Sequence, residues 1–171
     1  MRPGKSAGTK GGRLLLTNDD GFDAPGLAFF EDFLLAQGVR LTVVAPACEK
    51  SGAGHAMTFG DLRVTRRVRA SGVEGYAVDG TPADCVKWAM WRWKRRPFRM
   101  VVSGLNVGPN AGVSILYSGT VAAALEAAFH GVRAVAFSLD SHRVEDLPHG
   151  REGLALAWPA VAQGPWVPGE M

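Results

Sequence analysis

Two adjacent carboxylates near the start of the chain are the first candidates for chemistry. Asp19 and Asp20 follow the apolar run Leu14-Leu15-Leu16 and precede Gly21. A short apolar run bounded by Gly12 and Gly21 predicts a buried strand. Ligands of open α/β sheets bind at the carboxyl ends of the strands. Neighbouring carboxylates repel each other unless a cation or a proton neutralises them, so the pair indicates a cation site. A solvated Asp-Gly turn is the alternative interpretation.

Side chains that carry oxygen also follow the other predicted strands. Ser51 lies in the loop after the second strand, and Asn106 and Asn110 come after the third core strand. Carboxylate, hydroxyl and amide oxygens together favour Mg²⁺ or Mn²⁺ over Zn²⁺. Ser118-Gly119-Thr120 begins a predicted helix and offers N–H groups and hydroxyls to an anion, although such caps also occur in helices without a ligand. A metal site that faces an anion site is the arrangement of metal-assisted phosphoryl hydrolysis.

Strands and helices alternate along the chain, and this alternation positions those loops. Apolar runs predict core strands over 14–17, 41–45, 100–103 and 134–137, and a hairpin is expected from 62–69 and 76–78. Cap residues and apolar spacing predict helices over 25–37, from 81 onward, over 118–130 and over 154–162. Strands separated by helices predict an α/β fold with a mostly parallel sheet covered on both faces.

Composition indicates one globular domain over 13–171. The chain has 171 residues, of which 47% are apolar and 20% charged, and no apolar run is long enough to span a membrane. Residues 1–12 are polar, rich in glycine and without the apolar core of a secretory signal, so we expect a disordered tail in a cytoplasmic protein. Cys48 and Cys85 lack metal-site spacing, which predicts reduced thiols.

Charge gives little support to a nucleic-acid partner. The net charge is +3, but residues 1–12 hold three basic residues and no acid, so the remainder has 16 basic and 16 acidic residues. A neutral folded part argues against a dedicated nucleic-acid binder. Two basic clusters, at 63–69 and 92–99, are interpreted as solvated faces, with attraction of an anionic substrate as the alternative.

Several motifs in one order closely resemble the SurE family of stationary-phase survival proteins, over about residues 13–139. The motifs are Thr17-Asn18-Asp19-Asp20-Gly21, Ala24-Pro25-Gly26, Val44-Ala45-Pro46, Ser51-Gly52, Gly80-Thr81-Pro82-Ala83-Asp84-Cys85, Ser103-Gly104-Leu105-Asn106 and Tyr117-Ser118-Gly119-Thr120. The resemblance implies a three-layer α/β/α fold with a Rossmann-like sheet, and a 5'-nucleotidase that depends on a divalent metal and hydrolyses nucleoside 5'- and 3'-monophosphates. It implies metal ligands at Asp19, Asp20, Ser51 and Asn106, with catalysis centred on the two aspartates. It implies phosphate contacts at Asn110, Ser118, Gly119 and Thr120.

The chain departs from the family pattern in two places. Residues 113–116 are Val-Ser-Ile-Leu where family members often carry acids. Family members also continue beyond this chain's end, with a further core strand and an arm that helps to build dimers and tetramers. We therefore expect a C-terminally short member whose homodimer is weakened and whose stability is reduced.

Two alternatives stay open. A truncated, non-catalytic remnant that binds metal or nucleotide would keep the same loops. His55 could be a general acid or an ordinary packing residue.

Two other classes of protein are disfavoured. A phosphate-receiver domain needs an Asp after the third strand and a Lys after the fifth, where Ser103 and Ser138 stand. A haloacid-dehalogenase phosphatase is disfavoured because the adjacent aspartates do not form Asp-x-Asp.

Overall fold

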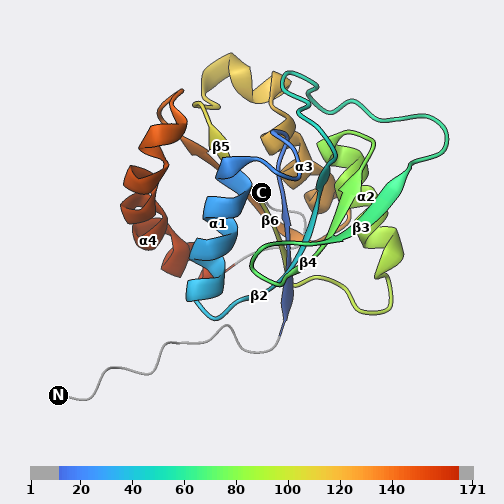
Figure 1. The fold of residues 1–171 in the computed structure, drawn as a ribbon, viewed down its shortest axis with the longest axis horizontal. Coiled ribbons are helices and arrows are strands. Elements are labelled where there is room, and N and C mark those ends of the chain that lie inside the picture. Colours follow the sequence, from blue (N-terminus) through green and yellow to red (C-terminus); the bar gives the residue numbers. More distant parts are fainter. Residues whose placement is uncertain (1–11, 166–171) are drawn as a thin grey trace.

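A six-stranded sheet forms the centre of the molecule (Figure 1). The computed structural model describes residues 12–165, so the expected tail, apart from Gly12, lies outside the described residues. The sheet order is β3-β4-β2-β1-β5-β6. All neighbours pair in parallel except β3 and β4, which form the expected antiparallel hairpin. The strands are β1 (Arg13–Thr17), β2 (Arg40–Pro46), β3 (Val64–Val68), β4 (Glu74–Val78), β5 (Met100–Val107) and β6 (Arg133–Leu139).

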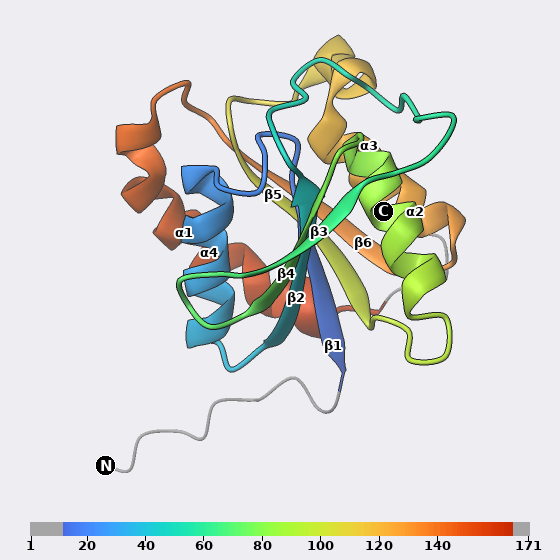
Figure 2. The ribbon, with the colours of Figure 1, turned by 45° about the vertical axis from the view of Figure 1, so that its right-hand side comes forward.

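Helices cover both faces of this sheet, which confirms the three-layer α/β/α prediction (Figure 2). α1 (Pro25–Ala36) and α4 (Leu147–Gln163) lie on one face, and α2 (Pro82–Arg92) and α3 (Gly119–Phe129) lie on the other. Leu14 and Leu16 belong to the core beneath α1 and α4, and Leu15 belongs to the core beneath α2 and α3. The apolar run of β1 is therefore buried on both sides, as a central parallel strand requires.

The helices that face the candidate site begin with side-chain caps. The Thr81 hydroxyl accepts the Asp84 N–H and the Asp84 carboxylate accepts the Thr81 N–H, which together form a capping box for α2. Ser118 caps α3 and accepts the Val121 N–H at 3.1 Å. These caps fix the first turns of both helices at the carboxyl edge of the sheet.

Several elements are longer than predicted, and β5 and α4 differ most from the prediction. β5 was expected to end at Ser103, but it continues to Val107 past an irregularity between Ser103 and Asn106. Gly104 has φ +126° there, and a Cβ on it would lie 2.4 Å from the Phe137 carbonyl oxygen. α4 begins at Leu147 rather than at 154, and a 3₁₀ helix over Gly112–Tyr117 was not predicted. Pairing with β6 and packing against α1 extend these elements beyond their local sequence signals.

The two thiols occupy contrasting environments. Cys48 is exposed just after β2, Cys85 is buried in α2, and both are free. Burial raises the pKa of the Cys85 thiol well above its ordinary value. Within 12–165, no helix has the length and apolar character that crossing a membrane requires.

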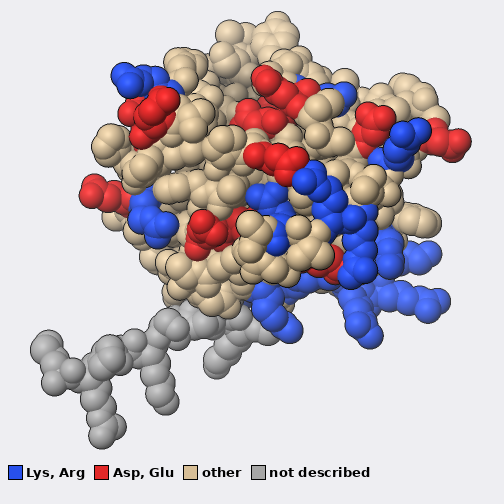
Figure 3. Space-filling model, viewed as in Figure 1, with Lys and Arg blue, Asp and Glu red and all other residues tan. Residues whose placement is uncertain are grey.

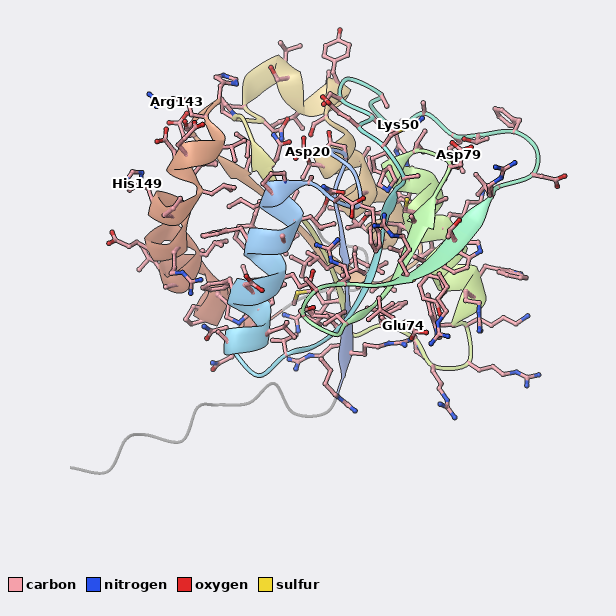
Figure 4. The ribbon with its side chains drawn as sticks, viewed as in Figure 1. Asp20, Lys50, Glu74, Asp79, Arg143 and His149 are labelled. Atoms are coloured by element: carbon pink, nitrogen blue, oxygen red, sulfur yellow. The ribbon has the colours of Figure 1, made fainter. Side chains whose placement is uncertain are left out.

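Basic side chains gather on one side of the molecule (Figure 3). In the first cluster, Arg66 pairs with Glu74 at 2.9 Å and Arg67 with Asp23 at 2.8 Å. The second cluster is exposed around the end of α2 and contains Arg92, Lys94, Arg95 and Arg96. Glu74, beside the first cluster, lies at the opposite end of the sheet from Asp20 (Figure 4). Arg66 and Arg67 of the first cluster are exposed, as the solvated-face interpretation requires, whereas the Arg69 side chain is buried and pairs with Glu31.

Candidate metal and phosphate site

The aspartate pair lies in the turn that follows β1. The strand ends at Thr17, so Asp19 and Asp20 are not forced to opposite faces of the sheet, as successive strand residues would be. Gly21 has φ +110°, and a Cβ on it would lie 3.2 Å from the Cys48 carbonyl carbon. The turn therefore needs glycine, both for its backbone conformation and for its close packing against the loop after β2.

The first turn of α3 holds Asp19 in place. The Thr120 hydroxyl donates to Asp19 Oδ1 at 2.5 Å, and the Thr120 backbone N–H also donates to this carboxylate. A Cβ on Gly119 would lie 2.7 Å from the Asp19 Cβ, so the helix approaches the aspartate as closely as glycine allows. Asp19 is only 5% exposed. Residues 101 positions apart are thus joined at the carboxyl edge of the sheet.

The electrostatics of the pair indicate a place for positive charge. Burial raises the pKa of Asp19, and hydrogen bonds from Thr120 partly oppose that shift. Burial, then the charges of Asp19 and Glu49, raise the pKa of Asp20 to about 6. Among residues 12–165, none of the ion pairs includes Asp19, Asp20 or Glu49. A proton or a cation would relieve this repulsion.

The loop over 47–63, which we call the β2–β3 loop, brings Ser51 to the same edge. The Lys50 N–H donates to the Asp19 carbonyl oxygen at 2.8 Å, which fixes the loop against the aspartate turn. Figure 4 shows Lys50 and Asp20 at the same end of the sheet. The Ser51 hydroxyl donates to Glu49 Oε1 at 2.7 Å, an interaction that the sequence did not predict. The charge of Glu49 raises the pKa of Asp20, so Glu49 is a further acidic neighbour of the pair.

Asn106 and Asn110 come from the β5 side of the site. Asn106 lies in β5 beyond the irregularity rather than in the expected loop, and its amide nitrogen donates to the Gly108 carbonyl oxygen at 2.7 Å. The amide oxygen is thus the Asn106 atom that would serve a cation. The Asn110 amide donates to the Ser138 hydroxyl at 2.8 Å, which ties Asn110 to β6.

The expected phosphate residues at the start of α3 are partly engaged by the protein itself. Ser118 caps the helix and Thr120 binds Asp19. The sequence predicted hydroxyls aimed at an anion, and it did not predict that Thr120 orients a carboxylate. The structure thus joins the proposed anion-binding helix start and the proposed metal ligand in one hydrogen-bonded unit.

The residues present fit a hard divalent cation. In the described part of the chain, three buried oxygens near these strand ends lack a hydrogen-bond partner: Thr17 Oγ1, Asn18 Oδ1 and Ser103 Oγ. No cluster of three or more His, Cys, Asp or Glu residues in 12–165 could hold a metal, so a cation here would rely on two carboxylates and neutral oxygens. That donor set suits Mg²⁺ or Mn²⁺ rather than Zn²⁺.

His55 is paired with a carboxylate on α3. Its Nε2 lies 2.8 Å from Glu126 Oε2, and its ring stacks on Phe129 with centroids 5.6 Å apart. The other oxygen of Glu126 lies 3.3 Å from His130 Nε2. His55 therefore contacts α3 through both a hydrogen bond to Glu126 and a ring stack on Phe129.

Comparisons with known proteins agree with the motif order. The family model described as survival protein SurE matches residues 14–162. The 5'-nucleotidase SurE of Carboxydothermus hydrogenoformans is 46% identical over 164 residues, which cover 90% of this chain and 60% of the relative. The corresponding protein of Rhodopirellula baltica is 50% identical over 131 residues, which cover 75% of this chain and 51% of the relative.

A solved structure of a SurE protein has the same fold. The crystal structure of the SurE protein from Aquifex aeolicus superposes with a TM-score of 0.74 at 32% identity, and the match covers 90% of this chain and 61% of that one. The chain spans between half and about three-fifths of the length of these relatives. The motifs, the fold and the family model agree, and the chain belongs to the SurE family.

Proposed function

We propose that this protein is a phosphomonoesterase that depends on a divalent metal and hydrolyses nucleoside 5'- and 3'-monophosphates to nucleoside and phosphate. The observation that carries the proposal is the Asp19–Asp20 pair: Asp19 is buried and held by Thr120 in the first turn of α3, Asp20 is half-buried beside it, and both carboxylates have raised pKa values. The names of the relatives support the 5'-nucleotidase part. The 3' activity rests on the family resemblance alone.

In this proposal Asp19, Asp20, Ser51 and Asn106 hold Mg²⁺ or Mn²⁺. The cation would orient and acidify the attacking water and offset charge that develops on the phosphoryl oxygens. Thr120 fixes the Asp19 carboxylate with its hydroxyl and its N–H. Asp20, whose pKa is about 6, is mostly ionised at neutral pH and can then serve as a ligand.

Phosphate recognition is assigned to Asn110, Ser118, Gly119 and Thr120. Support comes from the start of α3, where backbone N–H groups at a helix N-terminus favour an anion beside Asp19. The two free cysteines fit a reducing compartment, so we place the protein in the cytoplasm.

A panel of phosphomonoesters, assayed with Mg²⁺, Mn²⁺ or chelator, tests this proposal. We expect turnover of nucleoside monophosphates with little base preference, and none in chelator. Asp19→Asn should remove most activity, because it deletes ligand charge at nearly constant volume, and it should also weaken Mn²⁺ binding in calorimetry. If the pure, folded protein is inactive with every metal, the proposal that it is an enzyme is wrong.

The alternative is a protein that binds metal or nucleotide without turnover. Binding of Mn²⁺ and a nucleoside monophosphate without release of phosphate would identify this alternative.

A further inference from the structure

The β2–β3 loop is fastened to the rest of the molecule at separate points along its length. At its start, the Lys50 N–H donates to the Asp19 carbonyl oxygen at 2.8 Å. Further along, the Gly54 N–H donates to the Tyr117 carbonyl oxygen at 3.0 Å. Beyond them, the Ala56 carbonyl oxygen accepts the Thr81 hydroxyl at 2.7 Å. All three contacts use the backbone of the loop. A side-chain contact between Gly54 and Ala56 would add a further point of attachment.

His55 supplies that side-chain contact. Its Nε2 donates to Glu126 Oε2 at 2.8 Å, and its ring lies nearly parallel to Phe129, with 14° between the planes. Glu126 is 7% exposed, and a buried carboxylate that loses a hydrogen-bonding partner carries a large desolvation penalty. The buried end of this contact therefore holds the loop more firmly than an exposed ion pair would.

Both the contact to Asp19 and the contact to His55 are made by residues of α3. Thr120 at the start of α3 binds Asp19, and Glu126, six residues or about 9 Å further along the same helix, binds His55. α3 is a continuous helix from Gly119 to Phe129. It thus fixes the distance between the aspartate turn and the loop that carries Glu49 and Ser51.

We infer that His55 and Glu126 are a positioning pair that sets where Ser51 and Glu49 lie against Asp19 and Asp20, and thereby raises the affinity of the site for a divalent cation. The inference rests on the proposed function for the identity of the cation. Neither side chain serves as a ligand or contacts the reacting atoms; their effect passes through the backbone of the loop. Partners of this kind around metal ligands commonly change metal affinity by about 10- to 100-fold when they are removed.

Three variants of the full chain test the inference. His55→Ala removes the contact, and we expect the Mn²⁺ dissociation constant from calorimetry to rise about tenfold or more. His55→Gln keeps an N–H donor and should restore most of the affinity. His130→Ala is the matched control, because His130 contacts the same carboxylate at 3.3 Å but is the C-terminal cap residue of α3 and holds no loop. It should leave the affinity unchanged.

Amide hydrogen exchange of the metal-free protein gives a second readout. In His55→Ala, residues 49–58 should exchange faster, including the N–H groups of Lys50 and Gly54, while β1 keeps its protection. Unchanged exchange would overturn the inference, as would a loss of affinity that His130→Ala reproduces. If the unsubstituted protein binds no Mn²⁺, the proposed function and the effect on affinity both fail, and exchange alone decides whether His55 holds the loop.

Discussion

Asp20 keeps its proton to a higher pH in the folded protein than in the unfolded chain. Its pKa rises from 3.8 to about 6, because of burial and the neighbouring charges of Asp19 and Glu49. Between these two pH values the folded state binds more protons than the unfolded state, so the free energy of unfolding falls as pH rises. We predict that Asp20→Asn reduces this decline, measured by urea unfolding in chelator from pH 4 to pH 7. Parallel curves for the two proteins would contradict the raised pKa.

At the scale of single residues, the sequence predicted the aspartate turn but not the long-range contacts that hold it and the neighbouring loop in place. Asp19 and Asp20 could be found because an apolar run and a glycine bound them locally. The contact between Thr120 and Asp19 joins residues 101 positions apart, and that between His55 and Glu126 joins residues 71 apart. Such pairs depend on how the layers pack, which one sequence does not specify. Glu49 does carry a local signal, since it is an acid in the loop that follows a predicted strand.

At the scale of elements, the approach of α3 to β1 controls the site. We predict that Gly119→Ala destabilises the protein by about 1–3 kcal/mol and weakens Mn²⁺ binding, because its Cβ would lie 2.7 Å from the Asp19 Cβ and 3.1 Å from Pro82 Cγ. Chemical denaturation and calorimetry measure the two effects.

Gly153→Ala is the control for that substitution. Gly153 lies in α4, and a Cβ on it would meet nothing within 4 Å. Alanine should therefore leave metal binding unchanged and stabilise the helix by about 0.5–1 kcal/mol. If the two variants have the same stability and the same Mn²⁺ affinity, the close approach of α3 to Asp19 does not control metal binding.

The limits of the predicted elements have a common physical cause. The prediction for β5 stopped at Ser103 because Gly104 interrupts the apolar run, yet pairing resumes at Asn106 with Ser138. The prediction for α4 began late because Gly150 and Gly153 weaken the local helix signal. In both cases tertiary partners extend an element that local sequence alone would end.

At the scale of the whole molecule, one edge of the sheet is open. β6 forms this edge, and no further strand pairs with its outer side among residues 12–165. Most residues of β6 are half-buried, whereas six of the eight β5 residues are buried. We predict that appending a C-terminal segment from a longer family member that pairs with β6 raises the melting temperature, because added pairing would cover this edge. Scanning calorimetry measures the melting temperature. An extended chain that melts no higher than the unextended one would contradict the prediction.

The contrast between the two cysteines gives the molecule a pair of built-in chemical reporters. Cys48 is exposed and its backbone packs against Gly21, whereas Cys85 is buried in the core beneath α2. A colorimetric thiol reagent should therefore react at once with one thiol per native molecule, that of Cys48. The second equivalent should appear only as molecules open globally, so its rate reports unfolding without any substitution. A fluorophore placed on Cys48 would sit one packing contact away from the aspartate turn, where it can follow cation binding in the same sample.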